Sequence, residues 1–139
     1  MLKSEVPVQT RYAETDQMGV IHHSQYLIWC EIGRTDLIEK FGFSYAQMEA
    51  EGLLSPVTEV NLSYKKAIRY PAVATVATWL ESYTGIRATY GYEIKDESGD
   101  VCVDGTTTHV VVRKEDFRPV SIKKAAPDWH AVYKEQSRT

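Results

Sequence analysis

One helical pattern, followed mainly by strand patterns, constrains the fold of this chain more than any other feature. Across residues 24–41, apolar side chains and one glycine recur every three or four positions, as along the buried face of a helix: Tyr26, Trp29, Cys30, Gly33, Leu37 and Phe41. Leu27 and Ile28 widen this stripe, which predicts a helix buried on more than one side. Gly42 follows the pattern, and glycine commonly ends a helix at this position.

The residues after this helix predict an antiparallel sheet. Turn signals at meander spacings separate four β-rich runs, which are residues 54–64, 73–83, 86–95 and 101–113. Gly33, inside the helical pattern, costs about 1 kcal/mol of helix propensity relative to alanine. It therefore predicts close approach of the helix to another backbone, and hence a helix that lies on the sheet.

Shorter patterns complete the chain. Residues 5–12 alternate and predict a short strand, whereas residues 13–22 have the composition of a loop. Residues 44–52 predict a short capped helix, and Pro127 at the first turn of residues 128–136 predicts a final one. The order of strand, long helix and four strands predicts an α+β fold in which the sheet encloses one long helix.

Composition limits the size, the compartment and the partners of the protein. The 139 residues, 43% of them hydrophobic, predict a single domain over residues 1–139, with no internal repeat or linker. A formal net charge of -3 provides no basic field for nucleic acid. Cys30 and Cys102 form neither a metal motif nor a disulfide framework, and no run of about 18 apolar residues occurs. We expect a cytoplasmic protein without membrane insertion.

The segment from Arg11 to Tyr26 departs most from what folding requires. It places Asp16 in the loop before the long helix. A helix N-terminus presents N–H groups without partners and a partial positive charge, and these can stabilise an oxyanion. A carboxylate facing that site can attack a thioester carbonyl or activate a water molecule. Taken alone, however, an Asp before a helix is more often a turn or capping residue.

The string from Asp16 to Tyr26 resembles the signature of the 4-hydroxybenzoyl-CoA thioesterase-like family of hotdog-fold proteins. The signature consists of Asp, two variable residues, Gly, two aliphatic residues, an aromatic or polar residue, His or Tyr, two small or polar residues, and Tyr; the spacing here matches it without a gap. The resemblance extends over nearly the whole chain. It implies the hotdog fold, an antiparallel sheet wrapped around one long helix, and an acyl-CoA thioesterase that needs no metal or cofactor.

The resemblance also implies roles for individual residues. In that family the loop Asp is the nucleophile or general base, and the backbone N–H seven positions later polarises the thioester carbonyl; these positions are Asp16 and His23. Substrate contacts are expected from Gly19, His22 and Tyr26. Relatives often carry Tyr at the position of His22, so the acyl group is left open. Tyr26 also falls on the buried stripe, where core packing is the alternative role.

Lys65, Lys66 and Arg69 form the densest basic cluster of the chain. The phosphates of CoA need cationic partners, and the resemblance implies that this bend lies near the CoA entrance, often across a dimer interface. We assign CoA binding to the cluster and to no single member, because a solvated turn is the alternative for each residue.

Other polar residues are expected to have ordinary roles. Ser24 lacks a nucleophile elbow and is expected to cap the helix, and Glu14 is expected to be a solvated carboxylate. His22 and His23 are adjacent and lack further ligands at metal spacing. His109 and His130 give no reason to assign chemistry.

Uncovered sheet edges predict a homodimer or homotetramer. Two alternative functions remain open. A hotdog dehydratase would need a His paired with an acid in a different motif. A non-catalytic module would bind an acyl thioester, carried on CoA or on an acyl carrier protein, without hydrolysing it.

Overall fold

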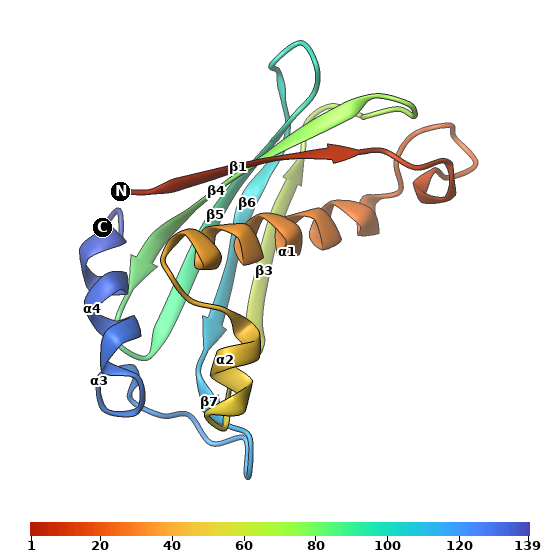
Figure 1. The fold of residues 1–139 in the computed structure, drawn as a ribbon. Coiled ribbons are helices and arrows are strands. Elements are labelled where there is room, and N and C mark those ends of the chain that lie inside the picture. The colour runs from red at the N-terminus through yellow and green to blue at the C-terminus, as the bar shows by residue number, and fades with distance from the viewer.

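A computed structural model describes residues 1–139 as a curved antiparallel sheet with a long helix across its concave face (Figure 1). In chain order the elements are β1 (Lys3–Gln9), the 3-10 helix η1 (Tyr12–Glu14), α1 (His23–Lys40), α2 (Tyr45–Ala50), β2 (Leu53–Leu54), β3 (Val57–Tyr64), β4 (Val73–Tyr83), β5 (Arg87–Lys95), β6 (Val101–Val110), β7 (Val112–Arg113), α3 (Ile122–Ala125) and α4 (Pro127–Gln136). The α+β class expected from the sequence is confirmed.

The order of the strands differs in part from the expected meander. The main sheet runs β1-β4-β5-β6-β3, and all neighbouring strands are antiparallel. Strands β4, β5 and β6 form the predicted meander, but the meander prediction is wrong for β3, which pairs with β6. The cause is the bend after β3, where the N–H groups of Lys65 and Lys66 bind the carbonyl of Cys102 (2.7 and 3.1 Å). The chain then crosses from the β3 edge of the sheet towards the opposite edge, where β4 pairs with β1 and β5.

Two of the expected strands are each divided. The run 54–64 becomes β2 and β3, and the run 101–113 becomes β6 and β7, because β2 and β7 form a small sheet of their own. The capped helix α2 and the Pro127 start of α4 are confirmed, and Ser44 Oγ accepts from the N–H of Gln47 (3.1 Å). Helix α3 was not predicted, because four residues are too few to show a helical period.

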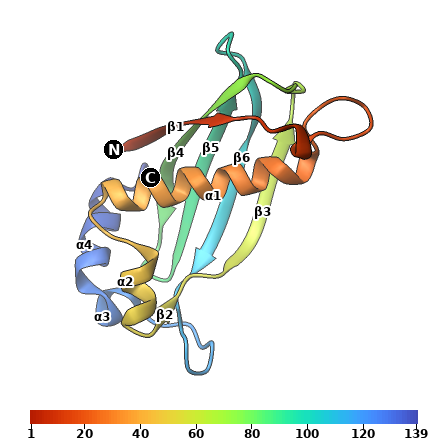
Figure 2. The ribbon, with the colours of Figure 1, turned by 45° about the vertical axis from the view of Figure 1, so that its right-hand side comes forward.

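Helix α1 packs against β1, β4 and β5, and the sheet curves around it (Figure 2). The hotdog arrangement is therefore confirmed. Gly33 permits the close approach: a Cβ at this position would overlap Thr78 Oγ1 and lie 2.8 Å from Val76 Cγ1. The expected approach is real, although the atoms that Gly33 accommodates belong to β4 side chains and not to a backbone.

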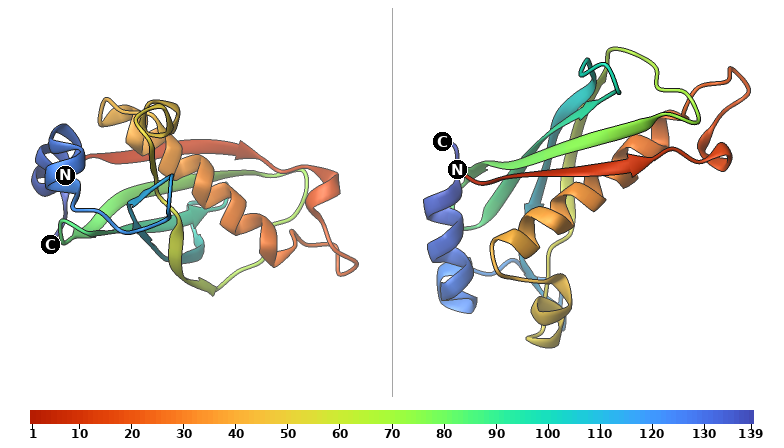
Figure 3. Two further views of the ribbon diagram at one scale, coloured as in Figure 1. Left: turned by 90° about the horizontal axis from the view of Figure 1, so that it is seen from below. Right: turned by 45° about the horizontal axis from the view of Figure 1, so that its top comes forward.

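Helix α4 covers the concave face at the end opposite the loop that precedes α1 (Figure 3). It buries Trp129 and Tyr133, and the hydroxyl of Tyr133 hydrogen-bonds that of Tyr90 on β5 (2.5 Å). Both chain termini lie at this end, so the loop before α1 occupies an end of the molecule free of terminal segments.

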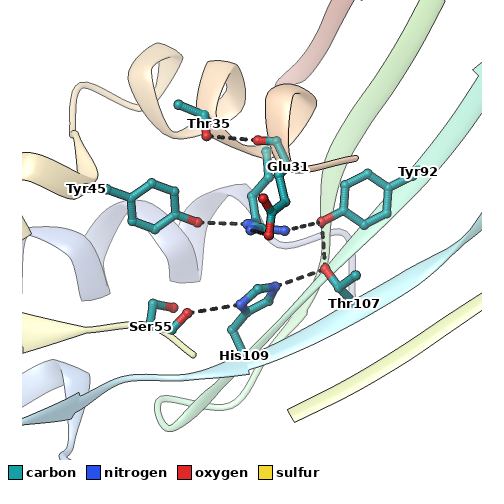
Figure 4. A network of polar contacts seen from close by, with 8 residues as sticks. Glu31, Thr35, Tyr45, Ser55, Tyr92, Thr107 and His109 are labelled. Carbon is teal, nitrogen blue, oxygen red and sulfur yellow. Dashed lines mark hydrogen bonds and ion pairs between the residues drawn. The ribbon is translucent and has the colours of Figure 1, made fainter. Parts of the chain in front are cut away.

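A buried polar network connects α1 and α2 to the inner face of the sheet (Figure 4). The guanidinium of Arg34 on α1 donates to the hydroxyl of Tyr45, the first residue of α2 (2.8 Å), and to that of Tyr92 on β5 (3.1 Å). The exposed Glu31 carboxylate lies 3.7 Å from the same guanidinium. These contacts offset part of the cost of removing the Arg34 charge from water.

The network continues to His109 on β6 with one direction of hydrogen bonding. The carbonyl of Ser55 can only accept, so His109 Nδ1 donates to it (3.2 Å). With its pKa lowered to about 4, the imidazole is neutral at pH 7, and its Nε2 accepts from Thr107 Oγ1 (3.0 Å). Thr107 has then used its only proton, so the Tyr92 hydroxyl donates to Thr107 Oγ1 (2.6 Å) while the Tyr92 oxygen accepts from Arg34.

The pKa of His109 is lowered from 6.5 to about 4, chiefly by burial of the imidazole and also by the positive charge of Arg34. The hydrogen bond to Ser55 acts in the opposite direction. Between pH 4 and 6.5 the unfolded chain therefore binds a proton that the folded protein excludes. The stability that this site contributes is fully present above pH 6.5 and is lost as the pH falls towards about 4.

We expect His109→Gln to flatten the acid side of the stability profile, because glutamine keeps a donor and an acceptor but does not titrate. The change in the pKa of His109 corresponds to roughly 3 kcal/mol of unfolding free energy across this interval. Urea denaturation at successive pH values measures the slope of the free energy of unfolding against pH. The control is His130→Gln, because His130 contacts Tyr83 and lies outside the network. An unchanged slope in His109→Gln would contradict the assignment.

Candidate active site

Asp16 lies in a tight turn before α1 that is built by local hydrogen bonds. Its N–H donates to the carbonyl of Val20 (2.9 Å), and its own carbonyl accepts from Gly19 (3.0 Å), which has a φ of +80°. Asp16 Oδ1 accepts from the N–H groups of Met18 (2.9 Å) and Val20 (3.4 Å). Asp16 Oδ2 has no hydrogen-bond partner within the chain. One carboxylate oxygen therefore shapes the turn, and the other is available to a ligand.

Glu14 connects this turn to α1, contrary to the expectation of a solvated carboxylate. Its side chain is buried, with Oε2 accepting from Trp29 Nε1 (3.1 Å) and Oε1 accepting from the N–H of Arg11 (2.7 Å). Its carbonyl accepts from the N–H of His22 (2.8 Å). The prediction was wrong because the buried indole of Trp29 needs an acceptor, and Glu14 on the turn of η1 supplies it.

The N-terminus of α1 is capped by His22 and not by Ser24. His22 Nδ1 accepts from the N–H of Ser24 (3.2 Å) and contacts Ser24 Oγ (2.8 Å), while the His22 carbonyl accepts from Gln25 (3.0 Å). His22 precedes the helix, so its imidazole can reach back to the N–H of Ser24, the second residue of α1. The Ser24 hydroxyl lies within the first turn and cannot cap that N–H. The N–H of His23 forms no hydrogen bond within the chain.

A cavity of about 280 Å³ brings most of the predicted site residues together. Asp16 and His23 line it, as expected, together with Tyr26, Lys65 and Lys66. The remaining lining residues are Met18, Val20, Ile21, Tyr64 and Ala67. Tyr26 is buried, as its place on the helical stripe predicted, and its hydroxyl accepts from the N–H of Ile68 (3.3 Å). The residue also forms part of the cavity wall, and substrate contact stays a prediction.

Three predicted residues lie beside the cavity and do not line it. Gly19 forms the turn, and its carbonyl accepts from Arg69 Nη1 (3.1 Å), so Arg69 holds the Asp16 loop in place. The His22 ring stacks on that of His23 with centroids 4.2 Å apart. For Gly19, His22 and Arg69 the structure thus gives a positioning role.

The two lysines of the basic cluster are paired with acids at the end of the sheet. Lys65 Nζ lies 2.7 Å from Asp104, and Lys66 Nζ lies 2.7 Å from Asp96 and 2.8 Å from Asp100. Hydrogen bonds to Asp100 and Asp96 raise the pKa of Lys66 above its usual range, and the bond from Lys66 lowers the pKa of Asp96. Both lysine side chains are about half exposed and line the cavity.

Tyr64 was missed from the sequence. It is the last residue of a β-rich run, where alternation assigns a tyrosine to a strand without indicating a site. Its hydroxyl donates to the carbonyl of His23 (3.3 Å), which places the ring at the mouth of the cavity. That contact joins residues distant in sequence, and the sequence contains no signal for it.

Three further features concern the chain as a whole. No group of three or more His, Cys, Asp or Glu side chains is arranged to hold a metal ion. None of the helices combines the length and the apolar character needed to cross a membrane. Cys30 and Cys102 are free, buried thiols.

Comparison with known proteins now decides the family. Residues 10–130 match the thioesterase-like superfamily. The chain belongs to this family. The resemblance stated from Asp16 to Tyr26 is thereby confirmed, and the match extends from the end of β1 into α4.

Individual relatives cover nearly all of the chain. A Bacillus subtilis (strain 168) protein described as putative acyl-CoA thioesterase YneP is 46% identical and aligns with 97% of this chain and 98% of its own length. A DHNA-CoA thioesterase from Staphylococcus aureus superposes with a TM-score of 0.94 at 44% identity, covering 97% of this chain and 91% of that structure. A 1,4-dihydroxy-2-naphthoyl-CoA hydrolase from Synechococcus sp. (strain RCC307) is 25% identical over 86% of this chain and 94% of its own.

Proposed function

We propose that this protein is an acyl-CoA thioester hydrolase that acts in the cavity between Asp16 and the N-terminus of α1. The observation that carries the proposal is that Asp16 and His23 line one cavity, and that each has a polar group without a partner in the chain: Asp16 Oδ2 and the His23 N–H. The relatives described as acyl-CoA thioesterase and as DHNA-CoA thioesterase support hydrolysis of a CoA thioester.

Asp16 Oδ2 is the reacting oxygen, because Oδ1 is held by the turn. As a general base, it takes a proton from a water molecule whose oxygen attacks the thioester carbonyl carbon. As a nucleophile, it attacks that carbon itself, and water then hydrolyses the resulting anhydride. The two routes share the same residues, and both stay open.

Either route places negative charge on the carbonyl oxygen of the substrate. The His23 N–H and the partial positive charge of the α1 N-terminus stabilise that charge. Collapse of the tetrahedral species breaks the C–S bond, and CoA leaves as a thiolate that then takes up a proton. The turn fixed by Glu14 and Arg69 sets the position of Asp16 relative to the helix.

The CoA moiety lies along Lys65 and Lys66 with Arg69 nearby, where the phosphates meet positive charge. Both lysine side chains are about half exposed, and so is Asp100 at 61%, whereas Asp104 and Asp96 are 33% and 15% exposed. Pairs between exposed side chains are worth only about 0–1 kcal/mol, so a phosphate displaces Asp100 most readily. This proposal assigns the charge to the cluster as a whole.

Assembly as a homodimer through β3 accompanies this function. β3 is an edge strand with exposed apolar side chains at Val57 and Val60, and Ile28 and Ile32 form an exposed apolar pair one turn apart on α1. The other edge, β1, contains Pro7, which lacks an N–H and is suited to a strand that stays unpaired. Two copies related by a two-fold axis can therefore join at β3, with the cavity beside the boundary.

Asp16→Asn tests the chemistry. Asparagine keeps the acceptor for the Met18 N–H but loses the charge and the basicity, so we expect kcat to fall at least ~10²-fold. Thiol release from a panel of acyl-CoAs measures kcat, and melting temperature and affinity for a non-hydrolysable thioether analogue are expected to stay near wild type. Asp128→Asn on α4 is the matched control. Near-normal kcat would remove Asp16 from the mechanism.

The same panel separates the alternative functions. A wild-type protein that binds the analogue but releases no thiol from any acyl-CoA or acyl carrier protein would be a binding module. Hydration of an enoyl thioester without thiol release would indicate a dehydratase.

Removal of the basic cluster tests CoA capture. We expect Lys65→Ala/Lys66→Ala to raise KM more than it lowers kcat, with an effect that shrinks in high salt. Arg69 is kept in this variant, because it holds the Asp16 loop through the carbonyl of Gly19. The control Lys123→Ala/Lys124→Ala removes the same charge from exposed positions elsewhere. Equal KM values for the two double variants at low ionic strength would show that Lys65 and Lys66 belong only to a solvated turn.

A charge on the β3 edge tests assembly. We expect wild type to have at least the mass of a dimer in light scattering at micromolar concentration, and Val60→Lys to shift it towards the monomer. Val73→Lys, at an exposed position on β4, is the control. A monomeric wild type with full activity would exclude the dimer.

A further inference from the structure

Tyr64 is a half-exposed aromatic residue on the inner face of the edge strand β3. It pairs with Val103 on β6, and 52% of the tyrosine is exposed although Val103 is buried at 1% exposure. Large aromatic side chains contribute most when they are buried. Since the Tyr64 ring is open and lines the cavity, it is available to a ligand there.

The ring is held in place although it is not buried. The Tyr64 hydroxyl donates to the His23 carbonyl (3.3 Å), and the ring lies edge-on to the His23 imidazole with centroids 6.3 Å apart. It also contacts the Tyr26 ring at 5.8 Å. The next two residues are anchored by their N–H groups to Cys102. The hydroxyl and the backbone next to Tyr64 are therefore both held by hydrogen bonds. A ligand that packs on this ring needs to immobilise it less, which lowers the entropic cost of binding.

The position of the ring relates it to the reacting groups. Tyr64 and Asp16 line the same cavity, and the Tyr64 hydroxyl donates to the carbonyl of His23, the residue assigned above to the oxyanion site. Met18 and Val20 on the Asp16 turn and the buried Tyr26 supply the other apolar walls. Tyr64 therefore shares a cavity wall with the apolar side chains nearest to Asp16.

We propose that Tyr64 determines acyl-group specificity by packing its ring against a planar aromatic acyl group. The inference rests on the proposed thioester hydrolysis and adds the class of acyl group and the residue that selects it. Aromatic pairs are stabilised by about 0.5–1.5 kcal/mol beyond the burial of area, which corresponds to roughly 2- to 13-fold in kcat/KM. A saturated ring of the same carbon skeleton gains only the area.

Two substrates and two variants test this directly. Benzoyl-CoA and cyclohexanecarbonyl-CoA have the same carbon skeleton, but only the first is planar and aromatic. We expect wild type to prefer benzoyl-CoA in kcat/KM, Tyr64→Phe to keep that preference, and Tyr64→Leu to lose it by several-fold. Tyr64→Phe removes the bond to His23 but keeps the ring, so any common loss in both variants reports positioning of His23 and not selection.

An unchanged preference in Tyr64→Leu, with melting temperature near wild type, would overturn the proposal. If Tyr64→Leu does not fold, Tyr64→Met supplies an apolar non-aromatic side chain, and the same preference decides the question. Affinities of the benzoyl and cyclohexanecarbonyl thioether analogues give the same comparison without turnover. An unchanged ratio of kcat/KM for benzoyl-CoA to that for cyclohexanecarbonyl-CoA would thus contradict only the role of Tyr64. Absence of thiol release from all substrates would contradict the proposed hydrolysis itself.

Discussion

The close packing of α1 on β4 is the constraint from which the rest of the structure follows. Gly33 admits the side chains of Val76 and Thr78 where any Cβ would collide with them, so the helix rests directly on the sheet. That contact sets the depth of the helix axis, so α1 packs mainly on β1, β4 and β5. On β3, Tyr64 meets His23 and Tyr26 of the first turn of α1. The β3 edge is where the cavity and the exposed apolar residues of β3 are found.

The candidate site depends on this placement of α1 through one connecting residue, Trp29. A helix fixed on the sheet fixes Trp29, and the Trp29 indole holds the buried Glu14 carboxylate. Glu14 in turn accepts from His22, so the cap of α1 and the turn of Asp16 are positioned by the same side chain and its carbonyl. The reacting groups are close in sequence, whereas the accuracy of their placement comes from contacts with the core.

Much of this was predictable because it is local. The helix 24–41 was placed within one residue of α1, and Asp16 and His23 line one cavity as the signature implied. The errors concern contacts between distant segments: the pairing of β3 with β6, the burial of Glu14 against Trp29, and the position of Tyr64 at His23. The cap was wrong for a different reason, since His22 and Ser24 are both able to reach the first N–H groups, and only side-chain direction distinguishes them.

The charges at the cavity mouth show a compromise between fixed geometry and free charge. Unpaired lysines would attract CoA phosphates most strongly, yet Lys65 and Lys66 are bound to Asp104, Asp96 and Asp100. These acids belong to β6 and the turn before it, so the pairs tie the bend after β3 to the sheet and hold Tyr64, the residue before Lys65, in position. Because both lysines are about half exposed, salt weakens their ion pairs, and an arriving phosphate competes at smallest cost with the exposed Asp100. The same residues can therefore order the wall of the empty cavity and receive the charge of the substrate.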